Sequence, residues 1–187
     1  MTPGAAAREG RNIDPAITIA IPVFEREELV RKALESALRQ PAADLEILVV
    51  DNASTDRTWE VLNSYRDPRL RLVRNERNLG LFGNFNRCIF LARGRYVTTL
   101  CSDDMLLDGF LEPARKLLDV DPEVGMVSSR GRAVDPRRGT TFPLGGNLPA
   151  GIYAREDAIA AALWAFSTFY VNPFNYPSGI LMRTAVA

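Results

Sequence analysis

The stretch YVTTLCSDD, residues 96–104, joins a short apolar run to two adjacent carboxylates. The run is typical of a buried strand, predicted at 96–102, that delivers acids to its carboxyl end. Ionised Asp103 and Asp104 side chains would repel each other, so a cation or hydrogen-bond donors are expected nearby. A divalent metal bound to a phosphate ligand would satisfy both carboxylates. The alternative is a strand followed by an Asp N-cap for a helix at 105–118, and this stretch alone does not decide between them.

Apolar runs and helical periodicity alternate through the first half of the chain. Strands are predicted at 17–24, 45–50, 70–74 and 96–102, and helices at 26–40, 57–65 and 84–92, with a turn at 78–83 and Gly94 ending the last helix. This alternation predicts βαβ units, and therefore an α/β fold with a mainly parallel central sheet and flanking helices. Ligands of such sheets bind outside the carboxyl ends of the strands, where Asp51, Asp103 and Asp104 would converge.

The second half of the chain has a less regular pattern. A helix is predicted at 107–120, a strand at 124–128, a loop or hairpin at 135–151, a helix at 155–165 and a late strand at 179–182. The composition shifts near Asp135, which fits two parts of one domain better than two separate domains.

The composition excludes several classes of function. The chain has 187 residues, of which 47% are hydrophobic and 25% charged, and a formal net charge of +0, so no nucleic-acid partner is expected. No histidine occurs, which excludes a Ser-His-Asp triad and His-ligated zinc within this chain. Cys88 and Cys101 lie in apolar runs and are expected to be reduced core residues. Residues 1–14 are expected to be a disordered tail rather than a secretory signal, and the default localisation is cytoplasmic.

Two phosphate-binding motifs are missing from the sequence. No GxGxxG follows the first predicted strand, and no GxxxxGK[ST] occurs anywhere. A phosphate-binding function would therefore depend on a metal rather than on a glycine-rich loop.

Five segments, taken in order, resemble the inverting glycosyltransferase family 2. They are IPVFE at 21–25, LVVDNASTDRT at 48–58, NLGLFGNFNRCIFLARGRYV at 78–97, SDD at 102–104 and NPFNYPSGILMR at 172–183. The resemblance covers roughly residues 17–183 and implies the GT-A (nucleotide-diphospho-sugar transferase, Rossmann-like) fold. It also implies transfer of a sugar from a nucleotide-diphospho-sugar to an acceptor hydroxyl with inversion, as in polysaccharide biosynthesis. The donor would be a UDP- or TDP-sugar, and the acceptor a glycan, a lipid-linked or a small molecule.

The resemblance assigns a donor site that chemistry supports. Phe24 would stack on the nucleobase and Pro22 would shape that turn; the alternative for Phe24 is a core position at a strand end. Asp51 would accept the N–H of uracil or thymine, or else cap the following turn. Glu25 belongs to the same donor-binding segment, at a position where Asn is frequent in the family. Arg74, Arg77 and Arg87 are the candidates for an arginine near the base.

The acidic pair divides into two roles under the same resemblance. Asp103 would face the ribose hydroxyls, and Asp104 would hold Mg²⁺ or Mn²⁺ against the diphosphate. Hard cations of this kind prefer oxygen ligands and often take only one or two protein carboxylates. The metal would neutralise charge on the leaving nucleoside diphosphate.

The resemblance does not assign a general base within this chain. The family's usual acid lies beyond the segment corresponding to 172–183, so we expect the base beyond Ala187 and leave the catalytic residue unknown. The predicted organisation is a tail at 1–14, a nucleotide-sugar-binding half at 15–135, and an incomplete acceptor-side segment at 136–187 of the same domain. The full-length protein could then associate with the cytoplasmic face of a membrane.

The sequence leaves alternatives for the function and for one aromatic segment. A catalytically silent nucleotide-sugar-binding module, truncated before its base, is the alternative function. A nucleotidyltransferase is disfavoured because residues 17–31 lack a glycine-rich basic loop. Aromatic residues between Trp164 and Tyr176 fit an acceptor platform, a core exposed by truncation, or a homodimer contact.

Overall fold

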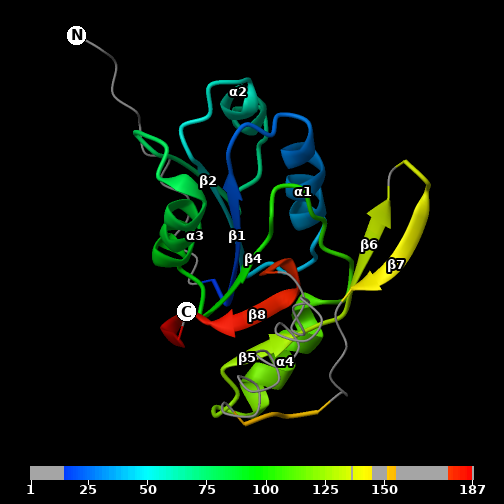
Figure 1. The fold of residues 1–187 in the computed structure, drawn as a ribbon. Helices are drawn as coiled ribbons and strands as arrows, with labels where there is room; N and C mark the ends of the chain where they lie inside the picture. The colour runs from blue at the N-terminus through cyan, green and yellow to red at the C-terminus, as the bar shows by residue number, and fades with distance from the viewer. Residues whose placement is uncertain (1–14, 136, 145–150, 155–176, 187) are drawn as a thin grey trace.

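A six-stranded sheet with helices on both faces forms the body of the protein (Figure 1). The computed structural model describes residues 15–135, 137–144, 151–154 and 177–186. The elements are β1 (Ile17–Val23), α1 (Leu29–Leu38), β2 (Leu45–Asp51), α2 (Thr58–Asn63), β3 (Leu70–Arg74), α3 (Gly80–Leu91), β4 (Tyr96–Thr99), α4 (Leu111–Val120), β5 (Met126–Ser128), β6 (Gly131–Asp135), β7 (Thr140–Leu144), the 3₁₀ turn η1 (Pro177–Gly179), β8 (Ile180–Arg183) and η2 (Thr184–Val186).

The sheet has the strand order β3-β2-β1-β4-β8-β5. The pairs β3–β2, β2–β1 and β1–β4 are parallel, whereas β8 runs antiparallel between β4 and β5. The predicted α/β fold with a mainly parallel central sheet is therefore confirmed. Because β8 is antiparallel, its first residues lie at the same edge of the sheet as the carboxyl ends of the parallel strands.

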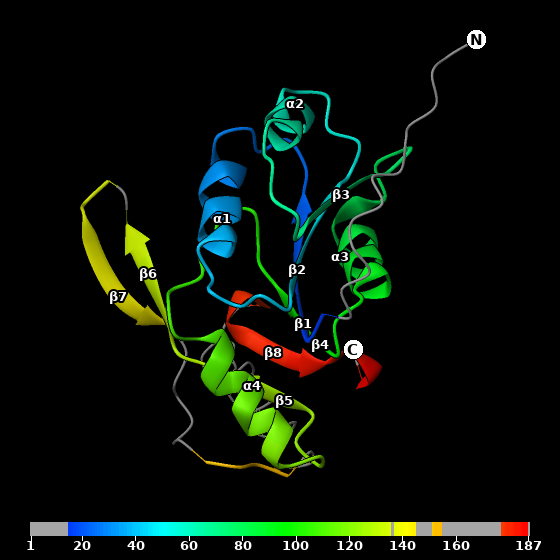
Figure 2. The same cartoon turned by 180° about the vertical axis from the view of Figure 1, so that it is seen from behind.

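Alternate side chains of the central strands build two cores. Ile19 and Ile47 belong to the larger core, which α1, α2 and α4 also supply, whereas Ala20 and Leu48 belong to a smaller core with Cys88 of α3. Figure 2 shows α1 and α3 on opposite faces of the sheet. Burial raises the pKa of the Cys88 thiol to about 12, which fits the predicted role as an inert core residue.

The helix predicted at 84–92 begins four residues earlier, at Gly80. The turn predicted at 78–83 is thus only partly right. Gly80 has a φ of +74°, and the Asn78 side chain accepts its N–H at 2.8 Å, so the helix starts directly on the Asn-Leu-Gly turn.

Gly94 does not end α3, contrary to the prediction. The helix stops at Leu91, and the next residue is already extended. A Cβ on Gly94 would lie 2.5 Å from the backbone nitrogen of Thr18 and 2.8 Å from the carbonyl oxygen of Tyr96. The glycine is therefore required by the close approach of this loop to β1.

The alternative of an Asp N-cap after the fourth strand is wrong. The strand predicted at 96–102 ends at Thr99, and the helix predicted to begin at Met105 or Leu107 begins only at Leu111. Gly109, with a φ of +82°, lies in the intervening loop. Asp103 and Asp104 therefore precede a loop and do not cap a helix.

The other predicted elements are present with shifted ends. The helices predicted at 26–40 and 57–65 are shorter in the structure, the strand at 124–128 begins at Met126, and the late strand ends at Arg183. Of the loop or hairpin predicted at 135–151, Asp135 and residues 137–144 belong to a hairpin that pairs β6 with β7 and begins at Gly131. The tail, the helix at 155–165 and the aromatic cluster lie outside the described residues.

Several arginines stabilise the fold rather than covering its surface. Arg69 donates to the carbonyl oxygen of Leu38 at 2.7 Å, and Arg183 donates to that of Asp121 at 2.9 Å, so each binds a helix carboxyl end. Arg71 pairs with the buried carboxylate of Glu46 at 2.8 Å. Among the helices that the structure describes, none is both long and apolar enough to span a bilayer.

Candidate active site

The carboxyl ends of β1, β2 and β3 meet at one edge of the sheet. Val23, the last residue of β1, pairs with Asp51, which in turn pairs with Arg74 at the end of β3. β4 ends before β1 does, because its last residue, Thr99, pairs with Ala20 and β1 continues to Val23. The segment after β4 therefore continues from the same edge of the sheet as the segments that follow β1, β2 and β3.

Asp51 is fully buried at this edge, and both of its carboxylate oxygens are bound. Arg74 Nε lies 3.0 Å from Oδ2, and the Ser54 hydroxyl donates to Oδ1. The Ser54 N–H also lies 3.3 Å from each oxygen. Of the three candidate arginines, Arg74 is therefore the one that the structure places beside Asp51.

Ser54 connects this carboxylate to the loop that follows β1. Its hydroxyl oxygen accepts the N–H of Glu25 at 2.9 Å, and the Thr55 hydroxyl donates to the Glu25 carboxylate at 2.9 Å. Glu25 has a φ of +50°, a conformation that a non-glycine residue adopts only when its surroundings hold it. Next to it, Phe24 keeps 37% of its surface exposed, as a residue stacking on a base would need. Pro22 is buried within β1.

The acidic pair after β4 forms a cluster with Cys101. The Cys101 sulfur and one oxygen each of Asp103 and Asp104 all lie within 4.8 Å of one another. The N–H of Asp104 donates to the Cys101 carbonyl at 3.0 Å, which closes the turn that brings the carboxylates together.

This donor set fits a hard divalent cation. Asp103 is exposed and Asp104 is half-buried, so both carboxylates can reach an ion at the surface. Burial, followed by the nearby Asp104 and Asp103 charges, raises the pKa of the Cys101 thiol. The two carboxylate oxygens are the hard ligands that Mg²⁺ and Mn²⁺ prefer.

Ser178 is a residue of this cluster that sequence reasoning missed. Its hydroxyl donates to Asp104 Oδ2 at 2.6 Å and accepts the N–H of Cys101 at 3.0 Å. The residue lies in η1, just before β8, and reaches the cluster because β8 is antiparallel to β4. Its segment resembled the family near the acceptor site, but no local pattern pointed to contact with the acids.

Four asparagines, which the sequence analysis did not assign, fix the loops behind the site. Asn52 accepts the Leu79 N–H at 2.9 Å and donates to Asn78 at 2.8 Å. The amide of Asn75 donates to both Asn52 and Asn84, at 2.8 and 2.9 Å. This network ties the loop after β3 and the start of α3 to the end of β2.

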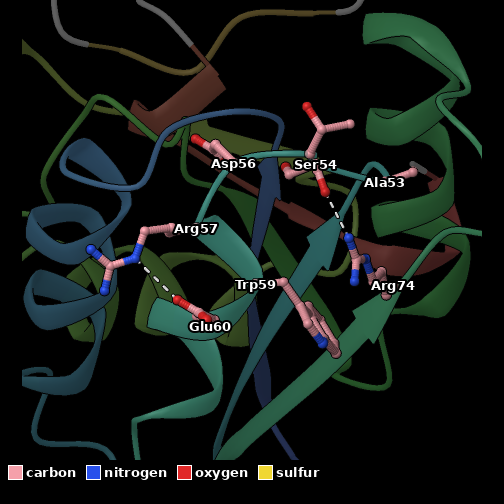
Figure 3. A pocket seen from close by; sticks show the side chains of 8 residues that line it. Ala53, Ser54, Asp56, Arg57, Trp59, Glu60 and Arg74 are labelled. Atoms are coloured by element: carbon pink, nitrogen blue, oxygen red, sulfur yellow. Dashed lines mark hydrogen bonds and ion pairs between the residues drawn. The ribbon is translucent and has the colours of Figure 1, made fainter.

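A pocket of about 530 Å³ opens beside α2 (Figure 3). Trp59 lies under the Arg74 guanidinium, 5.4 Å from its centre to the ring centroid, and Arg74 donates to the Ser54 carbonyl. The pocket shares Arg74 and Ser54 with the surroundings of Asp51. It shares no residue with the acidic cluster, so we assign it no part of the chemistry.

Comparison with known proteins identifies the family. The family model described as Glycosyl transferase family 2 matches residues 18–186. Chondroitin synthase of Escherichia coli is 31% identical over 168 residues, which cover 88% of this chain and 24% of that protein. The chain spans between 24% and 37% of the length of the first three curated relatives that it matches.

Solved structures agree with this assignment. The mannosyltransferase PcManGT from Pyrobaculum calidifontis, solved with GDP-Man and Mn²⁺, has a TM-score of 0.56 and 29% identity, covering 67% of this chain and 37% of that one. Staphylococcus aureus TarS 1–349 with UDP-GlcNAc has a TM-score of 0.63 over 91% of this chain and 46% of that one. Its 20% identity supports the fold alone. The chain therefore belongs to glycosyltransferase family 2 and has the GT-A fold.

Proposed function

We propose that this chain carries the donor site of a transferase that moves a sugar from a nucleotide-diphospho-sugar to an acceptor hydroxyl, with inversion and with the help of Mg²⁺ or Mn²⁺. The observation that carries the proposal is the pair of carboxylates, Asp103 and Asp104, held together at the carboxyl end of β4. The edge of a parallel sheet is where ligands of this fold class bind.

The two carboxylates have separate tasks in this proposal. Asp104, fixed by the Ser178 hydroxyl, holds the cation, while the exposed Asp103 faces the ribose hydroxyls. When bound, the cation neutralises charge on the departing nucleoside diphosphate. The hydrogen bond from Ser178 fixes the orientation of the Asp104 carboxylate, so the ligand is already oriented before the ion binds.

The nucleoside is bound between the loop after β1 and the end of β2. Phe24 stacks on the base, held in place by the contact of Glu25 with Ser54. Because Asp51 is fully buried beneath Arg74, a base reaches its carboxylate only when the Arg74 side chain turns outward. With Arg74 in place, Asp51 acts by holding the guanidinium that faces the base.

Named relatives support a transferase over the silent binding module. Chondroitin synthase and hyaluronan synthase, each matching 88% of this chain, are named for making polysaccharides. A glycan is accordingly the acceptor class that we favour. The expectation of a uracil- or thymine-containing donor rests on the family resemblance, and the neighbour solved with GDP-Man shows that this fold also takes guanine.

Nucleotide binding tests this function directly. Calorimetric titration of the chain with UDP, TDP and GDP, with and without Mn²⁺, should show metal-dependent binding of a pyrimidine nucleotide, tightened about tenfold or more by the ion. No metal-dependent binding of any nucleotide would rule the proposal out. Donor binding without transfer to any glycan acceptor, in a chain extended far enough to supply the expected general base, would favour the silent module instead.

Replacing Ser178 by Ala should weaken Mn²⁺ binding about tenfold, as loss of a residue that orients a metal ligand usually does. Asp104 would lose its fixed direction, and the Cys101 N–H would lose its acceptor. UDP binding in the absence of metal should not change, which separates positioning from general damage. Ser178→Thr keeps the hydroxyl and should restore the affinity. Equal Mn²⁺ affinity in Ser178→Ala and the unmodified chain would remove Ser178 from the site.

A further inference from the structure

The side of α3 that faces away from the sheet is apolar and exposed. Phe82 and Phe90 are 80% and 86% exposed, and Asn86 lies between them at four-residue spacing. Residues four apart lie along one line of a helix, so these three side chains form a stripe. Phe85 and Ile89, both half-buried, flank it. We call these five residues the α3 outer face.

The opposite side of the same helix packs against the sheet. Asn84 and Cys88 are buried against the sheet, and Leu91 packs on the smaller core. A helix on a protein surface normally shows a polar outer side, whereas one that is apolar all round is covered on both sides. In Figures 1 and 2, no described helix or strand covers the outer side of α3.

The charged residues of α3 and of the loop after it are all arginines. Residues 77–95 contain four arginines and no Asp or Glu, in a chain whose formal net charge is +0. Arg95 is paired with Asp119. Arg77, Arg87 and Arg93 are exposed, and within the described part of the chain none of them has an ion pair. Exposed aromatic rings beside free guanidinium groups suit a binding partner that has an apolar interior and anionic groups on its surface.

We propose that the α3 outer face binds an anionic lipid surface, with Phe82 and Phe90 inserted at the level of the headgroups and the arginines on the lipid phosphates. Helices that lie in a membrane interface combine these two features, and guanidinium groups bind phosphate oxygens in pairs. A second copy fits less well, because a symmetric contact through this face would bring the Arg87 side chains of both copies together.

This placement brings the site edge of the sheet close to the lipid. α3 begins at Gly80, whose carbonyl accepts a hydrogen bond from Asn52 at 3.3 Å, directly beyond the end of β2. An acceptor carried on a lipid would thus be presented beside the donor site. That consequence rests on the proposed function, whereas lipid binding by α3 does not, so the two are tested separately.

Co-sedimentation with vesicles tests the proposal. The chain should bind vesicles of phosphatidylcholine mixed with phosphatidylglycerol, bind phosphatidylcholine alone only weakly, and lose affinity as salt is raised. The double variant Phe82→Ser/Phe90→Ser should bind the mixed vesicles at least about tenfold more weakly, since burial of an aromatic side chain contributes that much. Arg87→Ser should weaken binding about fivefold, and only to the anionic vesicles.

The matched control is Val120→Ser on α4, where an apolar residue is 83% exposed but lies outside the face. Its vesicle binding should equal that of the unmodified chain, and all variants should keep their far-ultraviolet circular dichroism. Equal binding by the Phe82→Ser/Phe90→Ser variant, or no binding by the unmodified chain, would overturn the proposal. Self-association in the ultracentrifuge that this variant abolishes, without vesicle binding, would assign the face to a second copy instead.

Discussion

Asp104→Asn should abolish the Mn²⁺-dependent part of UDP binding and, in a chain extended to supply the expected general base, lower sugar transfer about a thousandfold, because several kcal/mol of charge stabilisation depend on the ion. The substitution keeps the size of the side chain, and its amide oxygen can still accept the Ser178 hydroxyl. What disappears is the negative charge that a hard cation needs. Calorimetric titration with UDP, with and without Mn²⁺, measures the first effect, and release of UDP from the donor measures the second.

The control for Asp104→Asn is the same change at Asp108, an exposed carboxylate in the same loop but outside the acidic cluster. Asp108→Asn should bind UDP and Mn²⁺ as the unmodified chain does. If Asp104→Asn kept full metal-dependent binding, the cation would have to be held elsewhere, and the assignment of the SDD stretch would fail.

Glu46→Ala should lower the free energy of unfolding by about 3–5 kcal/mol, the usual result of removing one partner from a buried ion pair. Glu46 is 7% exposed and accepts from Thr18 at 2.7 Å, from the Arg93 N–H at 3.0 Å and from Arg71 at 2.8 Å. Its loss leaves all three donors without this acceptor, at the point where the end of α3 meets the sheet. Denaturant unfolding followed by fluorescence gives the difference.

Glu60→Ala is the comparison for this stability prediction, because Glu60 and its partner Arg57 are both mostly exposed to water. That variant should unfold at the same denaturant concentration as the unmodified chain. Arg71→Ala and the double variant complete a cycle in which a coupling of about 1 kcal/mol or more is expected between Glu46 and Arg71. A Glu46→Ala variant as stable as Glu60→Ala would show that the buried network is not required for folding.

Much of the fold could be predicted because its signals are local. The apolar runs at Ile17–Val23 and Leu45–Asp51 are buried on both faces, which is typical of central parallel strands and is readable without a partner. The ends of elements were less predictable. α3 begins at Gly80, whose N–H donates to the Asn78 side chain, and α4 begins late at Leu111, and both outcomes depend on contacts within loops.

The residues of the candidate site also differ in how far the sequence could predict them. Asp51, Asp103 and Asp104 follow strands in the sequence, so their position beyond the carboxyl ends of β2 and β4 follows from a parallel sheet. The roles of these residues, with those of Pro22, Phe24 and Glu25, stay predictions, as does a general base beyond Ala187. The buried position of Asp51 under Arg74 was not foreseeable, because it depends on how Ser54 and Arg74 pack across the end of β3.

The sequence by itself determined the α/β class and the acids at the carboxyl ends of the strands, because hydrophobic period and strand-end chemistry are properties of short segments. Only the tertiary structure decided which residues support those acids. Ser178 reaches Asp104 across 74 positions of sequence, because β8 enters the sheet antiparallel to β4 and starts where β4 ends. The exposed outer face of α3 also depended on the tertiary structure. Apolar residues recur on both sides of this helix, and only the packing decides which side the sheet buries.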